Sequence, residues 1–440
     1  MHKLFCVSTI NASIITIGDE LLIGQTIDTN SAFIGRELNK IGVWIKRRVA
    51  VGDVWDDIWQ ALDEESRYSQ IILITGGLGP TADDITKPLL AKYFGGKLVV
   101  NEEVLNHVKY LFEKVYRRPQ GTMLERNLKQ AEVPDVCTVL HNARGTAPGM
   151  WFETSPNPSH GAAFEISDKR IFISLPGVPI EMKGLIMDEV IPRLQKKFSL
   201  PTIIHKTAFT FGMGESMIAE RIKDFETTLP ANIKLAYLPG YGMVKLRLTM
   251  ISENKKGEEI INPLFNELKE LVKDVLVTDE DEGLEITIGK ILLAKNKTMT
   301  TAESCTGGYI AHLITTVPGS SKYFKGSIVS YANEAKENLL HVQHNRLTSY
   351  GAVSEETVKE MAAGALKAMN TDYALATSGI MGPDGGSEEK PVGTVWIAAA
   401  SVNRMETLKL NLRFDRRRNI EQTAVTALNF LRKFILGDTL

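Results

Sequence analysis

The chain contains 440 residues, of which 43% are hydrophobic and 24% are charged, and its formal net charge is −2. At about 150 residues per domain, this length predicts two to four domains, each with enough apolar residues for a core. The balanced charge argues against general nucleic-acid binding, which depends on releasing counterions from many phosphates. We therefore expect no direct nucleic-acid partner.

The cysteine and hydropathy patterns bear on the cellular compartment. The three cysteines, Cys6, Cys137 and Cys305, lie far apart and form no CxxC pair. A disulfide framework or a structural zinc site is therefore not expected, and a reducing compartment fits. The sequence shows neither a signal peptide nor an apolar run of about 18 residues. These patterns predict a cytoplasmic protein with no membrane partner.

The first part of the chain alternates short apolar strands with amphipathic helices. Strands are predicted at 14–17, 43–51 and 71–75, and helices from about residue 31 and at 56–67. The segment before the first strand is interpreted as a disordered lead-in. This alternation predicts a parallel α/β sheet, whose active sites lie beyond the carboxyl ends of its strands.

The pattern changes after a loop at 154–161 and a further strand at 171–175. An α+β unit is predicted next, with strands at 205–211, 233–237 and 244–251 and helices at 215–225 and 258–272. The acidic run at 279–283 is interpreted as a linker, and its alternative is a solvated turn inside one domain.

An α/β pattern returns at residue 284. The first predicted helix ends at 295, and the others span 308–315, 354–369 and 419–435. The predicted strands span 298–302, 327–331, 373–377, 394–400 and 407–414.

The segment 301–308, TAESCTGG, is a predicted strand that runs into a helix. A hydroxyl at a helix N-terminus feels the positive end of the dipole, which favours Ser304 as a nucleophile. Glycines let backbone N–H groups approach an oxyanion, so Thr306, Gly307 and Gly308 are candidate substrate-binding residues. Alternatively, Ser304 only caps the helix, or Cys305 is the nucleophile, although free cysteines more often pack in cores.

The segment 331–336, YANEAK, contributes two further candidate catalytic residues, Tyr331 and Lys336. Tyr331 is predicted to end a strand and Lys336 to lie near the start of a helix. A lysine desolvated in a pocket can lose its charge and take the serine proton, and a tyrosine hydroxyl could relay it. The alternative is a solvated lysine on a helix surface.

A glycine-rich stretch at 378–393 connects two predicted strands. Several glycines in one connection suggest close approach to a ligand such as phosphate. The glycines proposed to bind substrate are Gly379, Gly385 and Gly386. Arg416 or Arg418 could supply a fork for the phosphate, and the sequence does not fix which. A mobile hairpin and a surface arginine triplet are the alternatives.

A second candidate site lies in the first part of the chain, where a strand, a glycine loop and a helix start follow one another at 75–87. Gly76, Gly77 and Gly79 at a helix start form an anion cradle. Asn30, which opens an earlier helix, is a further candidate for substrate binding.

Four carboxylates flank this cradle. Asp83 and Asp84 offer hard oxygen ligands for Mg²⁺ beside a diphosphate, and Asp19 and Glu20 end another strand. Metal ions and N–H donors are what diphosphate hydrolysis requires. Alternatively, Asp83 and Asp84 cap the helix and Asp19 and Glu20 are turn residues.

Five C-terminal motifs together closely resemble the nicotinamide-nucleotide amidase domain of the competence/damage-inducible protein A (CinA) family. They are AESCTGG, YxNEAK, GAVSEETV, SGIMGPDGG and EEKPVGTVW, and the match spans 285–438. The resemblance implies conversion of nicotinamide mononucleotide to nicotinate mononucleotide and ammonia. It implies Ser304 as nucleophile, activated by Tyr331 and Lys336, without a metal or other cofactor.

The region 14–182 resembles the molybdopterin-binding, MoaB/MogA-like domain found in the same family. The motifs are ITIGDELLIG, DTN, TGGLGPTADDIT, GTAPG and LPGVPIEM. The resemblance implies a three-layer α/β domain with metal-dependent ADP-ribose pyrophosphatase activity, although related proteins bind a pterin phosphate. The region 183–278 resembles the family's K-homology (KH)-type linker domain. It has no clear GXXG loop, so RNA binding is not supported.

The sequence thus predicts an α/β protein that is a bifunctional hydrolase of the pyridine-nucleotide cycle and a homodimer. One alternative is an amidase whose N-terminal domain only binds a nucleotide or pterin. The other is a non-enzymatic partner in DNA uptake or the response to DNA damage.

Overall fold

The computed structural model describes residues 10–79, 81, 84–115, 125–154, 170–240, 242–252 and 256–437. The chain forms two compact units: 1–204 with 250–259, and 205–249 with 260–440. Within the described ranges, no helix combines the length and the apolar content that crossing a membrane requires.

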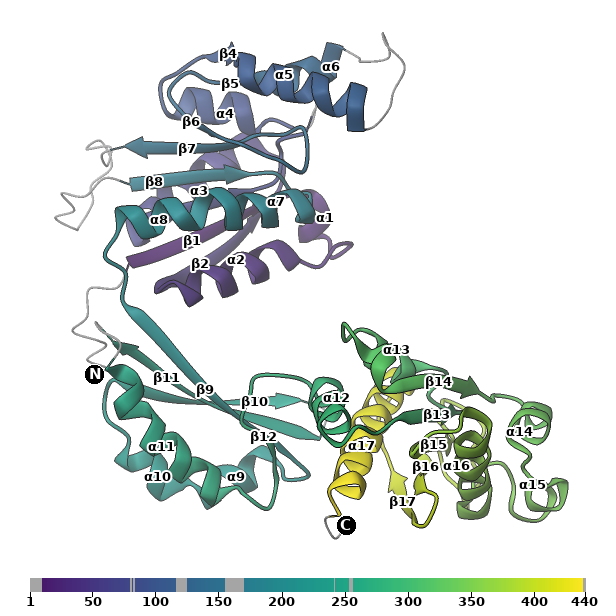
Figure 1. The fold of residues 1–440 in the computed structure, drawn as a ribbon. Helices are drawn as coiled ribbons and strands as arrows, with labels where there is room; N and C mark the ends of the chain where they lie inside the picture. Colours follow the sequence, from purple (N-terminus) through teal and green to yellow (C-terminus); the bar gives the residue numbers. More distant parts are fainter. Residues whose placement is uncertain are drawn as a thin grey trace. The chain divides into compact units, whose positions relative to one another are not determined.

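The first unit is built on a six-stranded sheet (Figure 1). Its strands, in spatial order, are β2 (Val43–Val51), β1 (Ile10–Ile17), β3 (Ile71–Thr75), β8 (Arg170–Leu175), β7 (Gly149–Thr154) and β6 (Thr138–Leu140). The first four of these pair in parallel, whereas β7 pairs antiparallel with β8 and β6 pairs antiparallel with β7. The carboxyl ends of β1, β3 and β8 therefore meet at one edge, where parallel sheets place their ligands.

Helices cover both faces of this sheet and give it three layers. One face packs against α2 (Thr29–Lys40), α7 (Pro179–Leu185), η3 (Ile186–Val190) and α8 (Ile191–Lys197). The other face packs against α3 (Trp55–Tyr68) and α4 (Thr86–Tyr93). The remaining elements of the unit are β4 (Leu98–Val100), α5 (Glu102–Tyr110), η1 (Leu111–Val115), α6 (Glu125–Leu128), η2 (Lys129–Ala131) and β5 (Glu132–Pro134).

The first strand starts earlier than the sequence pattern predicted. β1 begins at Ile10 rather than Ile14, so the last residues of the supposed lead-in belong to the sheet. Ala12 is fully buried, and the N–H of Asn11 donates to the side chain of Gln70. The short apolar run understated the strand because Asn11 and Ser13 interrupt its hydrophobic pattern.

The second unit begins with a four-stranded sheet. Its order is β10 (Ile233–Gly240), β11 (Met243–Ser252), β9 (Thr202–Phe211) and β12 (Leu276–Thr278). The accompanying helices are α9 (Glu215–Arg221), α10 (Lys223–Thr228) and α11 (Gly257–Leu271). The single helix predicted at 215–225 is thus broken at Ile222, a buried residue that leaves helical geometry.

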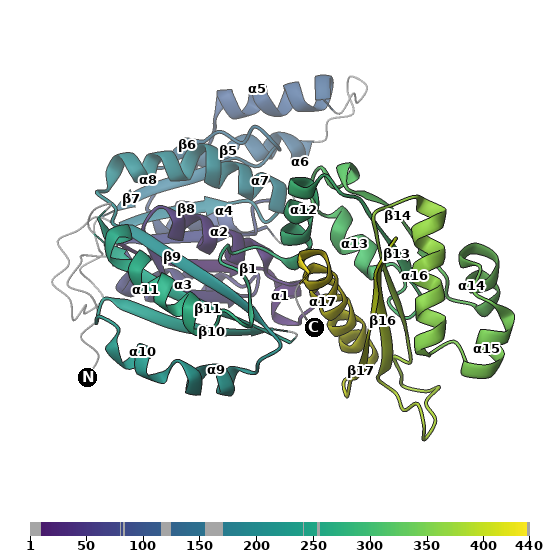
Figure 2. The same cartoon turned by 60° about the horizontal axis from the view of Figure 1, so that its bottom comes forward.

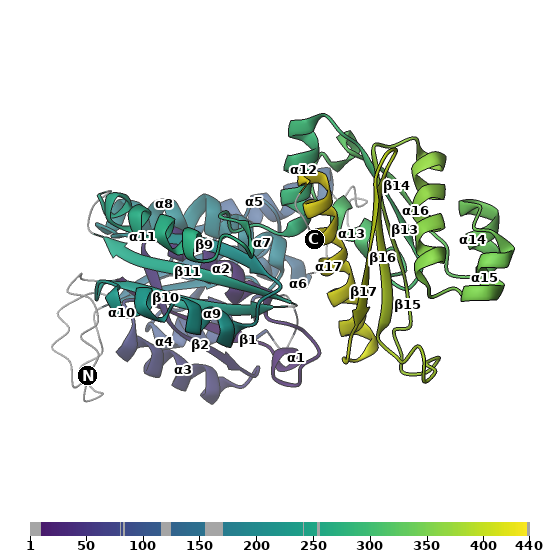
Figure 3. The same cartoon turned by 90° about the horizontal axis from the view of Figure 1, so that it is seen from below.

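A five-stranded sheet completes the second unit. Its order is β14 (Phe324–Val329), β13 (Met299–Glu303), β15 (Tyr373–Gly379), β16 (Thr394–Ser401) and β17 (Met405–Asn411). One face packs on α16 (Glu355–Met369), with α14 (Asn333–Leu340) and α15 (His344–Tyr350) beyond it (Figures 2 and 3). The other face packs on α12 (Leu284–Lys295), α13 (Tyr309–Thr315) and α17 (Arg416–Leu436). A short 3₁₀ turn, η4 (Ser320–Lys322), precedes β14.

The acidic run at 279–283 lies inside the second unit rather than between compact units. Its carboxylates pair with Lys245, Lys269 and Lys290, which come from β11, α11 and α12. Residues of β9 and β12 also share a hydrophobic core with α12 and α17. Along the chain, the run connects β12 of the four-stranded sheet to α12, which packs on the five-stranded sheet.

Gly364 allows α16 to approach the end of α14 closely. A Cβ atom at this position would lie 1.9 Å from the carbonyl oxygen of Leu340, the last residue of α14. We expect Gly364→Ala to lower the free energy of unfolding by about 1–3 kcal/mol, because backbone must shift to make room. Chemical denaturation measures this loss.

Ala363→Ser is the matched control, because Ala363 is the exposed neighbour of Gly364 on the same helix. Its effect should stay within about 0.5 kcal/mol. Equal stabilities for the two variants would contradict the close contact.

Candidate functional site

Ser304 lies directly after β13, the second strand of the five-stranded sheet, at the carboxyl end that β13 shares with its parallel neighbours β14 and β15. Its N–H donates to the carbonyl of Thr377 in the neighbouring strand β15 at 3.0 Å. The side chain is buried, with 8% of the residue's surface exposed. The serine is therefore held by two strands at once, at the sheet edge where chemistry is expected.

Lys336, from the first turns of α14, reaches the same place. Its Nζ lies 3.1 Å from Ser304 Oγ and also donates to the carbonyls of Ser330 at 2.8 Å and Tyr331 at 3.2 Å. Only 1% of this lysine is exposed, and burial lowers its pKa from the ordinary value. A neutral amine beside a serine hydroxyl can accept its proton.

Glu303, which the sequence analysis did not single out, is fully buried beside the serine. Its carboxylate accepts hydrogen bonds from the N–H groups of Gly308, Ile310 and Ala311. The hydroxyl of Thr306 donates to the same carboxylate and also contacts the Thr377 hydroxyl. The start of α13 is thus bonded to Glu303. Among the described residues, no backbone carbonyl accepts from the N–H of Cys305 or Thr306.

Gly307 and Gly308 both adopt positive φ angles, 59° and 92°, which favour glycine. The N–H of Gly307 donates to the Ser304 carbonyl at 3.2 Å, closing the turn. A Cβ at Gly307 would meet nothing within 4 Å, so the space above this residue is open.

Tyr331 occupies a different place from the one predicted. β14 ends at Val329, two residues earlier than expected, and the Tyr331 side chain is 65% exposed. Its hydroxyl accepts a hydrogen bond from Arg416 at 3.1 Å, while its backbone carbonyl faces Lys336. The tyrosine hydroxyl therefore does not lie between serine and lysine in this structure.

The arginine triplet lies in the first turn of α17, which begins at Arg416 because the Asp415 side chain caps it. Arg416 also donates to the carbonyl of Gly382 at 2.8 Å, linking the glycine-rich loop to Tyr331. Arg418 instead stacks over the Phe414 ring at 4.0 Å. Arg416 is thus the arginine that reaches the loop.

The predicted loop glycines have structural reasons of their own. A Cβ at Gly379 would lie 2.9 Å from the Thr394 carbonyl, and one at Gly386 would lie 2.7 Å from the Val392 nitrogen. Gly385 has a φ angle of 90°. These glycines are required by the loop's fold whether or not a phosphate binds there.

Cys305 does not have the properties of a nucleophile. It is buried, and this burial raises the pKa of its thiol to about 12. The reactive form of cysteine is the thiolate, which is then scarce at neutral pH. Ser304 is the better-placed nucleophile of the two.

The N-terminal candidate site lies where β1, β3 and β8 end. The Asn30 amide donates to the Thr75 hydroxyl at 3.3 Å and to the Gly177 carbonyl at 2.7 Å, and its buried Oδ1 has no partner among the described residues. A Cβ at Gly76 would lie 2.2 Å from the Ile17 carbonyl, and one at Gly77 2.1 Å from Thr86 Oγ1. These glycines let the loop pass close to neighbouring chain.

The carboxylates predicted as metal ligands are engaged within the protein. Asp84 accepts from the N–H groups of Gly79 at 2.8 Å and Thr81 at 2.9 Å, which is a loop-capping role. Asp19 accepts from the Asp53 N–H. Within the part of the chain that the structure describes, no three His, Cys, Asp or Glu side chains cluster as a metal site.

Glu20 and Asp83 are the other two predicted metal ligands. The Glu20 carboxylate lies close above Gly18, where a Cβ would meet its Oε1 at 2.5 Å. Asp83 lies outside the described residues.

Two residues near this site were missed by the sequence analysis. Lys87, next to the motif's Thr86, donates to the Gln130 carbonyl at 2.8 Å, and burial lowers its pKa to about 8. Glu181 accepts from the Asn142 amide at 2.6 Å, and its carboxylate occupies the space above Gly145. The contact between Glu181 and Gly145 joins the LPGVPIEM and GTAPG motifs. The spacing of these motifs in the sequence does not predict it.

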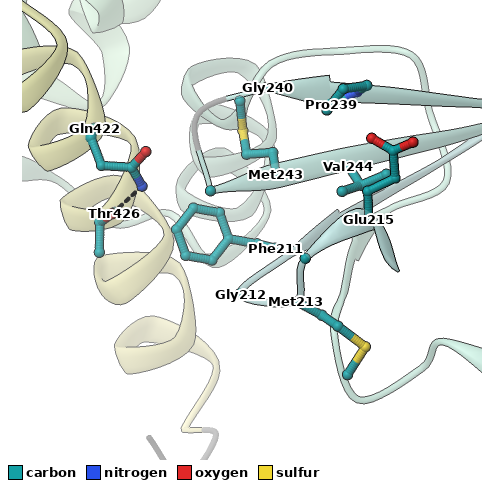
Figure 4. Close-up of a pocket in the computed structure, with 12 residues that line it drawn as sticks. Phe211, Gly212, Met213, Glu215, Pro239, Gly240, Met243, Val244, Gln422 and Thr426 are labelled. Carbon is teal, nitrogen blue, oxygen red and sulfur yellow. Dashed lines mark hydrogen bonds between the residues drawn. The ribbon is translucent and has the colours of Figure 1, made fainter. Parts of the chain in front are cut away.

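A separate pocket of about 390 Å³ lies in the second unit between the Gly212–Gly214 turn, the β10–β11 hairpin and α17 (Figure 4). Phe211, Met213 and Met243 line it together with Gln422 and Thr426. Ser304 and Lys336 are not part of its lining. The pocket is therefore distinct from the serine–lysine site.

Three family models match the chain. They are a probable molybdopterin binding domain at 13–196, a damage-inducible protein CinA KH domain at 205–277 and a CinA C-terminal domain at 281–435. The architecture thus comprises a MoaB-like N-terminal domain, a KH-like middle domain and a CinA C-terminal domain, as the resemblance implied.

Curated relatives match along nearly the whole chain. A CinA-like protein of Cytophaga hutchinsonii is 48% identical over 426 residues, covering 96% of this chain and 98% of its own. One of Flavobacterium psychrophilum is 45% identical over 430 residues, covering 97% and 99%. Among solved structures, the competence/damage inducible protein CihA of Agrobacterium tumefaciens is 38% identical, covers 34% of this chain and 92% of its own, and has a TM-score of 0.34. From its relatives over the full length, the chain belongs to the CinA family.

Proposed function

We propose that the C-terminal domain hydrolyses the carboxamide of nicotinamide mononucleotide, giving nicotinate mononucleotide and ammonia. The observation that carries this proposal is the 3.1 Å approach of Lys336 Nζ to Ser304 Oγ, where the lysine is almost completely buried. An amine without charge can act as the base that a serine nucleophile needs.

The reaction would proceed in two halves. Lys336 takes the Ser304 proton as Oγ bonds to the amide carbon, and it then gives that proton to the departing nitrogen, which leaves as ammonia. Water next adds to the acyl ester, its proton passes through Lys336 to Ser304 Oγ, and the carboxylic acid departs. No cofactor takes part in this scheme.

Residues near Ser304 are candidates to bind the oxyanion and the phosphate of that substrate. The N–H groups of Cys305 and Thr306, which have no backbone acceptor among the described residues, are candidates to bind the oxyanion. Arg416, held between Gly382 and Tyr331, is the candidate to bind the phosphate. Tyr331 would then act on the phosphate side of the substrate.

For the N-terminal domain we propose hydrolysis of ADP-ribose to AMP and ribose 5-phosphate. The supporting observation is the buried, unpartnered Oδ1 of Asn30 at the strand ends, next to the glycine turn and the start of α4. The described carboxylates do not by themselves form a metal centre, so no step is assigned to an ion. Binding of a nucleotide or pterin without turnover is the alternative for this domain, and a non-enzymatic partner role is the alternative for the chain.

Replacing the proposed nucleophile should abolish the amidase reaction. We expect Ser304→Ala to reduce ammonia release from nicotinamide mononucleotide by at least about 1,000-fold, because no acyl ester can form. Cys305→Ala is the matched control and should keep more than about a tenth of the rate, since its thiol is protonated and packed. The reverse pattern would make Cys305 the nucleophile.

The pH dependence should report the state of Lys336. Only the neutral amine can accept a proton, so kcat/KM should rise with pH and level off below the ordinary lysine pKa of about 10.4. The direction follows from burial, which lowers the pKa of Lys336. Lys336→Gln should lose activity while its circular dichroism stays unchanged. A rate that declines across the same rise in pH would exclude a lysine base.

ADP-ribose cleavage should depend on the loop that Asp84 holds. Asp84→Asn places an amide against the N–H or hydroxyl of Thr81, so we expect at least a tenfold loss of turnover, about 1.4 kcal/mol. Asp135→Asn, which alters a similar loop contact to the Lys97 N–H, is the control.

Detection of ribose 5-phosphate and AMP, with and without excess chelator, measures the turnover of each variant and its dependence on a metal ion. Turnover that persists in chelator excludes a metal ion. Turnover that is lost and then restored by Mg²⁺ means that the reaction requires the ion. Binding without any turnover would favour the non-catalytic alternative.

A further inference from the structure

The Glu303 carboxylate accepts hydrogen bonds from four of the segments around the nucleophile. Its Oε1 accepts from Thr301 Oγ1, Ser327 Oγ and the Ala311 N–H, at 3.2, 3.4 and 2.8 Å. Its Oε2 accepts from Thr306 Oγ1 and the N–H groups of Gly308 and Ile310, at 2.8, 3.0 and 3.1 Å. These donors come from β13, β14, the turn after Ser304 and α13.

A fully buried carboxylate is costly unless its charge is met by hydrogen bonds. All six donors to Glu303 are neutral, so their number and geometry must offset the cost of burial. The arrangement has a consequence for the turn at 304–308. Thr306 in the middle of the turn and Gly308 at its end both donate to the side chain of the residue before Ser304.

The same bonds decide which N–H groups remain for a substrate. The N–H groups of Gly308, Ile310 and Ala311 are directed at Glu303, so the start of α13 is already occupied by a negative charge. A substrate oxyanion at that helix end would meet a carboxylate. The candidates to bind the oxyanion lie earlier in the turn, at Cys305 and Thr306, whose N–H groups meet no backbone acceptor among the described residues.

We propose that Glu303 is a positioning residue of the amidase site, which fixes the turn so that Ser304 Oγ faces Lys336 and the N–H groups of Cys305 and Thr306 face the substrate. This inference rests on the proposed amidase function. Glu303 touches neither Ser304 Oγ nor Lys336 Nζ by any hydrogen bond in the described structure, so it acts through the backbone of the turn.

The test uses the full chain and two readouts. The first is the steady-state kinetics of ammonia release from nicotinamide mononucleotide. The second is the rate at which a fluorophosphonate labels Ser304, followed by intact-protein mass spectrometry. In that reaction Oγ bonds to phosphorus, fluoride leaves and the serine proton passes to Lys336, so the readout needs no knowledge of the natural substrate.

Glu303→Gln replaces one acceptor oxygen by an NH₂ group that faces N–H and O–H donors. We expect kcat and the labelling rate to fall about 10- to 100-fold, since small displacements of a nucleophile cost that much, while KM changes less than about threefold. Glu303→Asp keeps the charge and shortens the side chain. Glu303→Asp should lower kcat and the labelling rate by a smaller factor. If Glu303→Gln does not fold, this variant tests whether Glu303 positions the serine.

Asp372→Asn is the matched control. Asp372 accepts from the N–H and hydroxyl of Thr298 at 2.8 and 2.9 Å, at the opposite end of β13 from Glu303. It should lower stability without changing the labelling rate. Equal loss of labelling in both variants would reduce Glu303 to a structural role and overturn the proposal.

Unchanged labelling and kcat in Glu303→Gln would also overturn it, as would a wild-type chain that is not labelled at Ser304. A wild-type chain that is labelled but releases no ammonia would refute the proposed substrate. The labelling rates of the variants would then still decide whether Glu303 positions the serine.

Discussion

The central constraint on the C-terminal domain is the burial of the Lys336 amine, which lies 3.1 Å from the Ser304 hydroxyl. Two backbone carbonyls, those of Ser330 and Tyr331, accept from this amine, and neither carries a charge that would favour the ammonium form. Burial disfavours the charged ammonium form and so lowers the pKa of Lys336. Among the described residues, no carboxylate bonds to the amine to offset this effect. A solvated lysine at the same distance would hold its proton and could not serve as a base.

The fold supplies this arrangement through packing that is remote from the chemistry. α14 carries the lysine, and its last residue lies against Gly364 of α16, which in turn covers the face of the sheet. The serine follows β13, an internal strand that pairs with β14 on one side and β15 on the other. The serine and the lysine therefore come from elements that are each fixed by the same hydrophobic core.

Much of this could be predicted from the sequence, because strand ends and helix starts leave local signals. The alternating strands and helices indicated a parallel sheet, and the motifs at 301–308 and 331–336 indicated a serine and a lysine that the structure brings together. Tyr331 was predicted to end a strand and to relay the serine proton, but the strand ends at Val329 and the hydroxyl accepts from Arg416 instead. Arg416 lies 85 residues further along the chain, so the local pattern around Tyr331 could not show this contact.

Glu303 could not be found in the same way. A glutamate at the end of an apolar strand usually faces solvent, and its six donors are backbone N–H groups and hydroxyls of ordinary residues, which leave no pattern in the sequence. At the N-terminal site, the glycines and Asp84 were read as ligand-binding features, but each has a packing or capping contact in the structure. Motif glycines alone do not distinguish between a cradle for a ligand and a close crossing of two backbones.

The burial of Cys305 has a consequence for the durability of the neighbouring serine. With a thiol pKa near 12, this residue presents almost no thiolate, which is the form that peroxides and electrophiles attack. A sulfur atom adjacent to the reacting oxygen would otherwise be a point where oxidative damage could disable the turn. By enclosing it, the domain keeps its chemistry on oxygen and nitrogen atoms, which tolerate oxidising stress.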